Sequence, residues 1–380
     1  MFICLRYWIR VVKIEELKTP AFIVDLPKLT TNIRNMQERA RKHGVRLRPH
    51  VKTHKTAEIA RLQTPDEDRG ITVSTLAEAR FFQKAGFDDI TYAFPISPNK
   101  LAEAAELTGH LKQFHILLDQ LDTATAVESY GRANTVCFSV FLKVDCGYHR
   151  AGVDPSTPES IHLAAQMQAS QHIQFQGILT HAGHSYHCRN RKEIVGVAQQ
   201  ERDVMVEFAQ RLQHDGIDCR TVSVGSTPTA VHAPGWPGVS EIRPGNYAFF
   251  DKFQADVGSC SLEEAAATVL TTVVAHYPQH NQMLIDAGAL ALSKDPGATH
   301  LDQEIVFGKV TGNPLLKIFS ISQEHGLVTS PVPIDFNNFP VGRLLQIIPN
   351  HSCLASALYD RYHVVNGNRV VDEWRPMRGW

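Results

Sequence analysis

The 380-residue sequence lacks a surplus of charge of either sign, with 38 Lys and Arg against 39 Asp and Glu. A general nucleic-acid binder needs a basic face, so we expect no nucleic-acid partner. The chain also lacks an uninterrupted run of about 18 apolar residues, which argues against membrane spanning. Its seven cysteines are odd in number and scattered without paired spacing. That usage favours a reduced, cytoplasmic protein over a disulfide framework.

The first twelve residues are apolar but too short to span a bilayer, and Arg6 and Arg10 interrupt them. No small-residue cleavage site follows before the polar stretch at residues 13–18. We therefore expect a strand or an extended start here rather than a signal peptide. The rest of the chain shows no internal repeat and no low-complexity stretch.

The middle of the chain alternates short β-rich runs with longer helical runs. Such alternation predicts a parallel sheet, and eight units over roughly 200 residues predict a closed TIM-type (β/α)8 barrel. The eight β-rich runs are residues 47–52, 71–75, 89–94, 114–119, 137–145, 173–181, 221–225 and 240–250.

The two ends of the chain differ from this middle part. Residues 19–26 predict a strand, and residues 27–44 predict a helix with Ile33, Met36 and Ala40 on one face and a terminal Gly44. After about residue 256, β-like runs punctuated by Gly, Asn and Pro predict an all-β domain, with a hairpin signal at Asn366-Gly367. We expect a barrel over residues 26–255 and a β domain over residues 256–380, joined by the N-terminal segment 1–25.

A lysine between two histidines ends the first barrel run, in the sequence RPHVKTHK at residues 48–55. If this strand alternates, His50, Lys52 and His54 share a face, and the ends of barrel strands face the active-site mouth. A lysine crowded by other cationic groups can form a Schiff base. Composition alone favours a solvated basic turn instead.

At this lysine the sequence resembles a known family. TPAFIVDL, a helix and then RPHVKTHKT are similar to the alanine racemase-type (fold type III) enzymes that use pyridoxal 5'-phosphate (PLP). Within them, the chain resembles the branch of D-serine dehydratase and D-threonine aldolase. The lysine of the HxKTHK motif holds PLP in that branch and maps onto Lys52. The resemblance covers about residues 16–380, and residues 1–15 depart from it.

Small and hydroxyl-bearing residues follow the seventh β-rich run, in VGSTPT, and lie within the eighth, in RPGNY. TIM barrels often bind phosphate at this place, because small residues let backbone N–H groups approach and hydroxyls add donors. Either stretch alone is a weak signal, since a Gly-Ser-Thr turn is usually only a turn. The resemblance implies that the PLP phosphate is held by Gly225, Ser226, Thr227, Gly245 and Asn246.

Two further loops carry motifs of the same family. Residues 143–152 look like its VDxGxxRxG stretch, which implies that Arg150 lies near the PLP phenolic oxygen. Residues 181–186, HAGHSY, imply that Tyr186 approaches the pyridine side and that His181 packs against the ring. Two alternatives stay open: a plain surface role for Arg150, and a metal site made by His181, His184 and His187.

His351 and Cys353 form a candidate metal pair in the sequence PNHSCL. Residues i and i+2 point to one side of an extended segment, and imidazole and thiolate are preferred zinc ligands. On spacing alone the signal is weak, and a buried Cys beside a packed His is the favoured explanation. PNHSCL resembles the D-serine dehydratase motif whose His and Cys bind Zn²⁺, although sulfur ligation does not exclude Mn²⁺ or Co²⁺.

The resemblance implies a dehydratase that converts a D-3-hydroxy amino acid to a 2-oxo acid and ammonia, with Lys52 as the general base at Cα. D-serine, D-threonine and D-threo-3-hydroxyaspartate all fit. Aldolases of the branch tend to place a carboxylate where Cys353 stands, so the cysteine favours a dehydratase. Retro-aldol cleavage to glycine and an aldehyde is the alternative. A racemase would need a second base that we cannot place, and non-catalytic PLP-binding relatives lack the β domain. The relatives are dimers, which implies a homodimer.

Overall fold

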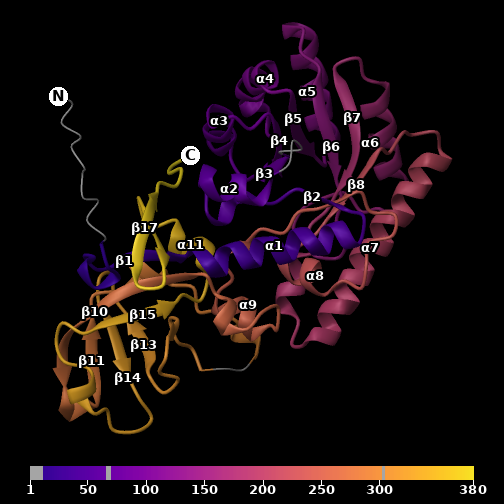
Figure 1. Ribbon diagram of the computed structural model, residues 1–380. Helices are drawn as coiled ribbons and strands as arrows, with labels where there is room; N and C mark the ends of the chain where they lie inside the picture. The colour runs from indigo at the N-terminus through magenta and orange to yellow at the C-terminus, as the bar shows by residue number, and fades with distance from the viewer. Residues whose placement is uncertain (1–11, 66–69, 302–303) are drawn as a thin grey trace, which may run out of the picture.

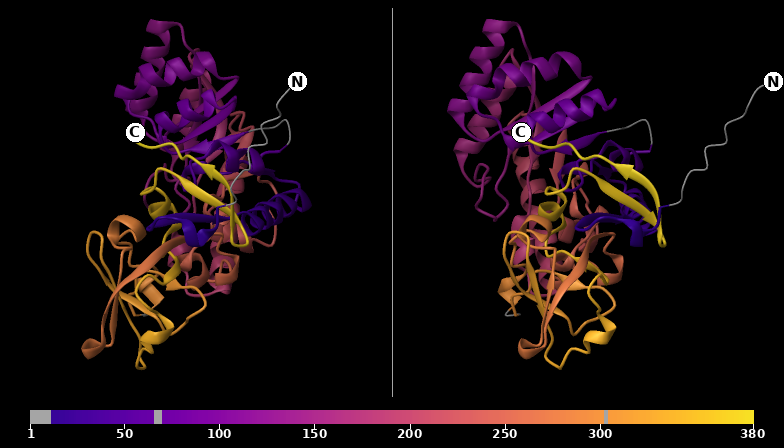
Figure 2. Two further views of the ribbon diagram at one scale, coloured as in Figure 1. Left: turned by 60° about the vertical axis from the view of Figure 1, so that its left-hand side comes forward. Right: turned by 90° about the vertical axis from the view of Figure 1, so that its left-hand side faces the viewer.

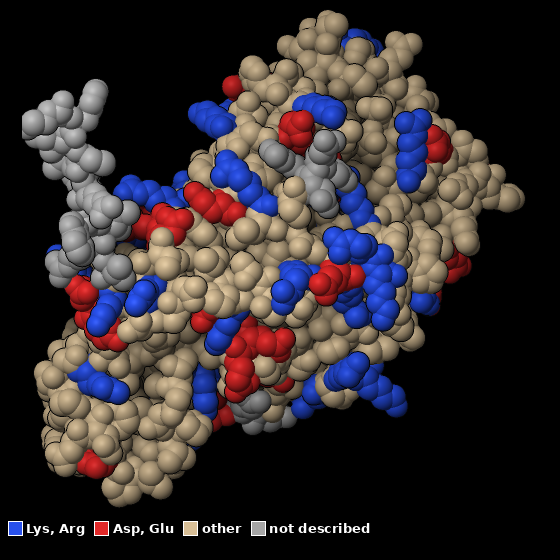
Figure 3. All heavy atoms as spheres, viewed as in Figure 1, with Lys and Arg blue, Asp and Glu red and all other residues tan. Residues whose placement is uncertain are grey.

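The computed structural model describes residues 12–65, 70–301 and 304–380, which form two sheets in two lobes (Figures 1 and 2). The apolar start at residues 1–11 lies outside the described residues, so the expectation for it is not addressed. Among the described residues, no helix has both the length and the apolar character needed to cross a bilayer. On the face seen in Figure 3, basic and acidic side chains are interspersed rather than segregated.

The first sheet contains eight parallel strands in the order β2-β9-β8-β7-β6-β5-β4-β3. An isolated parallel bridge between His50 and Thr72 joins its two edges. This arrangement, with helices on the outside (Figure 1), confirms the predicted TIM-type barrel. Its strands are β2 (Arg46–Leu47), β3 (Ile71–Val73), β4 (Asp89–Pro95), β5 (Gln113–Leu118), β6 (Phe138–Lys143), β7 (Ile173–Leu179), β8 (Thr221–Val224) and β9 (Glu241–Ile242).

The sequence determines where helix α1 (Leu26–Lys42) begins and ends and which face it buries. The Asp25 side chain accepts a hydrogen bond from the Lys28 N–H at 3.0 Å and caps the helix. The predicted apolar face is buried, and Gly44 follows the helix at φ +63°. The other helices of this lobe are α2 (Ala57–Gln63), α3 (Leu76–Lys84), α4 (Leu101–His110), α5 (Leu121–Asn134), α6 (Pro158–Ala169), α7 (Arg191–His214) and α8 (Thr227–His232).

The second sheet has nine strands in the order β11-β14-β13-β12-β15-β10-β1-β16-β17. Its N-terminal strand β1 lies between β10 and β16, antiparallel to the first and parallel to the second. The predicted hairpin at Asn366-Gly367 joins β16 to β17. The strands are β1 (Ala21–Asp25), β10 (Ala267–Tyr277), β11 (Gln282–Ile285), β12 (Lys309–Val310), β13 (Lys317–Ile321), β14 (Gly326–Thr329), β15 (Leu344–Ile348), β16 (Tyr362–Asn366) and β17 (Arg369–Trp374); the short helices are α9 (Lys252–Asp256), α10 (Ala289–Leu292) and α11 (Ser352–Ser356).

The first barrel strand is shorter than predicted. It ends at Leu47, and Lys52 lies in a 3-10 turn, Val51–Thr53. The chain turns because the His50 side chain accepts a hydrogen bond from the Lys52 N–H. The prediction that His50, Lys52 and His54 share a strand face is therefore wrong: His54 is fully buried and bonds Gln63 at 3.0 Å.

Candidate active site

One cavity of ≈ 350 Å³ lies where the ends of the barrel strands meet the segment that follows β15. It brings together ten of the eleven predicted site residues: Lys52, Arg150, His181, Tyr186, Ser226, Thr227, Gly245, Asn246, His351 and Cys353. The eleventh, Gly225, lines an adjoining cavity of ≈ 400 Å³ that shares Lys52, Arg150 and His181 with the first.

The turn that carries Lys52 is fixed from the C-terminal part of the chain. The Ser356 hydroxyl donates to the Thr53 carbonyl at 2.7 Å, and the Tyr362 hydroxyl donates to the His54 carbonyl at 3.0 Å. His50 lines the cavity beside Lys52. Burial, followed by the charge of Lys52, holds the pKa of His50 well below its usual value. The imidazole is therefore neutral at neutral pH.

The residues expected to hold a phosphate suit that group. Ser226 caps α8 by accepting a hydrogen bond from the Thr229 N–H at 3.2 Å. The Thr227 hydroxyl oxygen is buried and, apart from its interaction with the Tyr186 hydroxyl, has no hydrogen-bond partner among the described residues. A Cβ on Gly245 would lie 2.8 Å from the His50 carbonyl oxygen. Only glycine therefore allows this close approach of the two loops.

Flat and cationic side chains form another wall of the cavity. His181 donates from Nδ1 to the Gly225 carbonyl at 3.1 Å, and burial followed by the charge of Lys52 keeps its pKa well below the usual value. The Arg150 guanidinium lies 5.0 Å from the centre of the Tyr148 ring. The ring of Tyr186 packs against Phe253, with centroids 5.9 Å apart, and burial raises the pKa of its hydroxyl.

His351 and Cys353 do not lie on an extended segment as predicted. His351 is the N-cap of α11, and Cys353 sits in the first turn of that helix, where the two side chains interact and the Cys353 sulfur lies 3.2 Å from the Thr53 hydroxyl oxygen. Burial disfavours the charged imidazole, but the Cys353 sulfur and the Asp295 carboxylate outweigh it and raise the pKa of His351 to about 11. Burial likewise opposes ionisation of the Cys353 thiol, but the nearby His351 has the larger combined effect and lowers the pKa of Cys353.

The donor chemistry at this pair fits a zinc-like ion, with one nitrogen and one sulfur and room for further ligands. Among residues 12–65, 70–301 and 304–380, no group of three or more His, Cys, Asp or Glu side chains is placed to hold a metal. The alternative of a site made by His181, His184 and His187 therefore has no support. His181 bonds Gly225, while the ring of His187 packs against that of His300 at 5.9 Å.

Several cavity residues escaped the sequence analysis. Arg243 stands in the RPGNY motif and lines both cavities. Burial, partly offset by Glu241, lowers its pKa to about 10. Asp251, in the same cavity, is fully buried and accepts hydrogen bonds from the Asn246 amide at 2.7 Å and the Ser352 N–H at 2.9 Å. No local motif marks Asp251, because its partner Ser352 comes from a distant segment of the chain.

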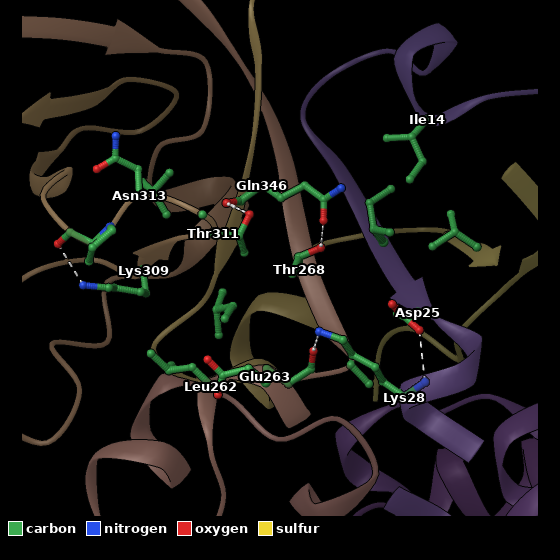
Figure 4. Close-up of a pocket in the computed structure, with 18 of the residues that line it drawn as sticks. Ile14, Asp25, Lys28, Leu262, Glu263, Thr268, Lys309, Thr311, Asn313 and Gln346 are labelled. Carbon is green, nitrogen blue, oxygen red and sulfur yellow. Dashed lines mark hydrogen bonds between the residues drawn. The ribbon is translucent and has the colours of Figure 1, made fainter. Parts of the chain in front are cut away.

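A larger cavity of ≈ 550 Å³ lies between β1, β10, β12 and β15 and contains none of the predicted site residues (Figure 4). Two of its polar side chains illustrate hydrogen bonding within the protein. Thr268 donates to Gln346 at 3.2 Å, and the Lys309 ammonium donates to the Pro314 carbonyl at 3.0 Å. The chemistry therefore singles out the cavity with Lys52.

The chain matches two family models, the alanine racemase N-terminal domain over residues 24–252 and a serine dehydratase domain over residues 266–365. It is 42% identical to D-serine dehydratase of Dictyostelium discoideum over 97% of this chain and 98% of that protein. D-threonine aldolase of Arthrobacter sp is 29% identical over 95% of this chain and 92% of that protein.

The structure of D-threo-3-hydroxyaspartate dehydratase from Delftia sp. HT23 is similar to it, with a TM-score of 0.93 and 35% identity over 97% of this chain and all of that one. Alanine racemase of Clostridium difficile 630 shares only the fold, with a TM-score of 0.68 and 14% identity over 93% of this chain and 97% of that one. The chain therefore belongs to the alanine racemase-like, fold type III family of PLP enzymes, in the branch that contains the D-serine and D-threo-3-hydroxyaspartate dehydratases.

Proposed function

We propose that this enzyme is a metal-assisted dehydratase that converts a D-3-hydroxy amino acid, with D-serine as the first candidate, to a 2-oxo acid and ammonia. One observation carries the proposal: a single ≈ 350 Å³ cavity holds the amine of Lys52 together with the nitrogen and sulfur of His351 and Cys353. Elimination of water needs a base at Cα and an electrophile at the β-hydroxyl, and this cavity supplies groups for both.

The cofactor would be held at its two ends. Ser226 and Thr227 line the cavity on the side where the phosphate would sit, together with Gly245 and Asn246, where the absence of a Cβ lets the loop pack closely against His50. Arg150 would pair with the ionised phenolic oxygen, while His181 and Tyr186 border the ring. Lys52 would carry PLP between turnovers; once the substrate amine replaces Lys52, the cofactor would supply an electron sink for the pair left at Cα, and the Lys52 amine is free.

Different side chains of the cavity would carry out the two parts of the elimination. The Lys52 amine takes the Cα proton of the D-enantiomer as a general base. His351 and Cys353 would hold a divalent ion, and Zn²⁺ best matches this donor set. The bound ion would act as a Lewis acid that stabilises the departing hydroxyl. Since Cys353 must stay a free thiolate to serve as a ligand, a reducing, cytoplasmic setting suits the site.

A product assay tests this function and separates it from the aldolase alternative. Protein loaded with PLP and zinc should release a 2-oxo acid and ammonia from D-serine, D-threo-3-hydroxyaspartate or D-threonine. Lys52→Ala should lose both the visible absorbance of bound PLP and turnover. Lys55→Ala is the matched control, because Lys55 pairs with Glu78 at 3.1 Å and does not line either cavity. Release of glycine and an aldehyde, or no product from any of the three, would contradict a dehydratase.

The proposal extends to a homodimer, which the family resemblance implies and exposed apolar side chains support. Leu354 adjoins Cys353 in α11 and is 46% exposed, and Leu290 in α10 is 54% exposed. Light scattering should give about twice the chain mass of 42.4 kDa. Leu354→Asp should shift the protein toward single chains if this helix meets a partner copy. A wild-type mass of one chain at micromolar concentration would rule the dimer out.

A further inference from the structure

We infer that Asp295 is a positioning residue for the metal pair: its carboxylate holds His351 by Nδ1, so that Nε2 is the imidazole nitrogen available to a metal ion. The inference rests on the proposed metal site and names the residue that prepares it. Asp295 lines the same cavity as His351 and Cys353. Its Oδ2 lies 3.1 Å from His351 Nδ1, so the Nδ1–H donates to the carboxylate and Nε2 is left for other partners.

Both carboxylate oxygens of Asp295 are engaged. While Oδ2 accepts from His351, Oδ1 accepts the Gly297 N–H at 2.8 Å, within the loop at residues 293–297 that follows α10. The side chain therefore cannot rotate toward the cavity without losing two hydrogen bonds.

The main chain of this loop is fixed to the segment that bears His351. The Asn350 amide donates to the Asp295 carbonyl at 2.8 Å and to the Val306 carbonyl at 2.6 Å. Asn350 is 2% exposed and directly precedes His351. The loop is therefore held to the His351 segment at two points, by the Asp295–His351 side-chain pair and by the Asn350 amide at the Asp295 carbonyl.

The loop also begins with a strained residue. Ser293 has φ +68° and ψ 167°, a conformation that favours glycine. A residue with a side chain persists there only where the surroundings hold it in place. The strain occurs two residues before Asp295, which fits a loop shaped to deliver that carboxylate.

The chemistry of an orienting carboxylate differs from that of a ligand. A carboxylate that accepts the Nδ1–H fixes the tautomer with a lone pair on Nε2 and raises the basicity of the imidazole as a ligand. Because Nδ1 and Nε2 lie on opposite sides of the ring, the Asp295 oxygen is on the side away from the donated lone pair. Asp295 therefore acts through His351 rather than on the metal.

Zinc binding tests the inference without an activity assay. We expect Asp295→Ala, loaded with PLP and stripped of metal, to bind zinc about 10- to 100-fold more weakly than wild type in competition with a chromogenic chelator. Asp295→Asn should lose less, since an amide oxygen still accepts the Nδ1–H. Asp335→Asn is the control, because Asp335 caps a distant 3-10 turn and its loss should leave zinc affinity unchanged.

Cobalt spectra distinguish orientation from ligation. With Co²⁺ in place of zinc, Asp295→Ala should keep the thiolate charge-transfer band of Cys353 and the coordination number of wild type, whereas Cys353→Ala should lose the band. Zinc affinity of Asp295→Ala equal to that of wild type would overturn the inference, as would a change in coordination number, which would make Asp295 a ligand. Wild-type protein that binds no zinc would instead overturn the proposed metal pair, and this inference with it.

Discussion

Arg48 shows at the scale of one residue how the barrel interior supports the site above it. It is 2% exposed, and its guanidinium donates to both oxygens of Asp89, at 2.6 and 3.0 Å, and to Glu241 at 2.8 Å. Glu241 in turn accepts the Ser223 hydroxyl, and Ser223 bonds Arg243, which lines the active-site cavity. A connected set of buried charges thus runs from the barrel interior to the cofactor cavity.

This buried cluster predicts a specific acid sensitivity. Burial opposes ionisation of Glu241, but Arg48 outweighs it and lowers the pKa of Glu241 from 4.5 to about 2. A pKa below the unfolded value stabilises the fold above pH 4.5, and that contribution is lost as pH falls toward 2. Glu241→Gln should lower the free energy of unfolding at pH 7 by about 3 kcal/mol and flatten the loss of stability below pH 4.5.

Denaturant unfolding at several pH values measures both effects. Glu207→Gln, on an exposed position of α7, should reproduce the wild-type profile. An acid profile of Glu241→Gln that matches wild type would mean that the Arg48 cluster contributes nothing to stability.

At the scale of elements, the sequence located all eight barrel strands but misplaced the ends of the first and the last. The apolar runs mark where each strand is buried. Where a strand ends depends on turns made by side chains and by Pro and Gly, so β9 stops at Ile242 just before Arg243-Pro244-Gly245. The local structure at the metal pair was also not predictable from the sequence. The sequence pairs His351 with Cys353, but it does not show that they lie at the start of a short helix, α11, which packs against the turn at Lys52.

Helix α7 contributes a residue that no sequence signal marks. Glu201 is 1% exposed and accepts the Ala182 N–H at 3.1 Å and the Gly225 N–H at 2.8 Å. One carboxylate thus ties the loop after β7 to the loop after β8, and these loops carry His181 and Ser226. A Glu within a long, charged helix is usually solvated, so only the folded chain reveals this role.

At the scale of the whole molecule, the cofactor lysine and the metal pair come from different lobes, and a few hydrogen bonds set their spacing. Besides the bonds from Ser356 and Tyr362 to the carbonyls of Thr53 and His54, the Met377 N–H donates to the Lys55 carbonyl at 2.8 Å. The C-terminal part of the chain therefore holds the backbone on the C-terminal side of Lys52 relative to His351 and Cys353.

Tyr362→Phe should therefore harm turnover more than cofactor binding. Loss of the bond to the His54 carbonyl leaves a buried acceptor unpaired and should cost about 1–2 kcal/mol of stability. A shift of the Lys52 turn by a fraction of an ångström should lower kcat about 10-fold, because misplacement of about 1 Å can cost about 100-fold. Tyr359→Phe is the matched control: its hydroxyl donates to Ala291 at 3.1 Å, away from Lys52, so stability should fall similarly while kcat stays at the wild-type value. Equal kcat values for the two variants, measured with saturating PLP and zinc, would show that the spacing of the two lobes does not limit the reaction.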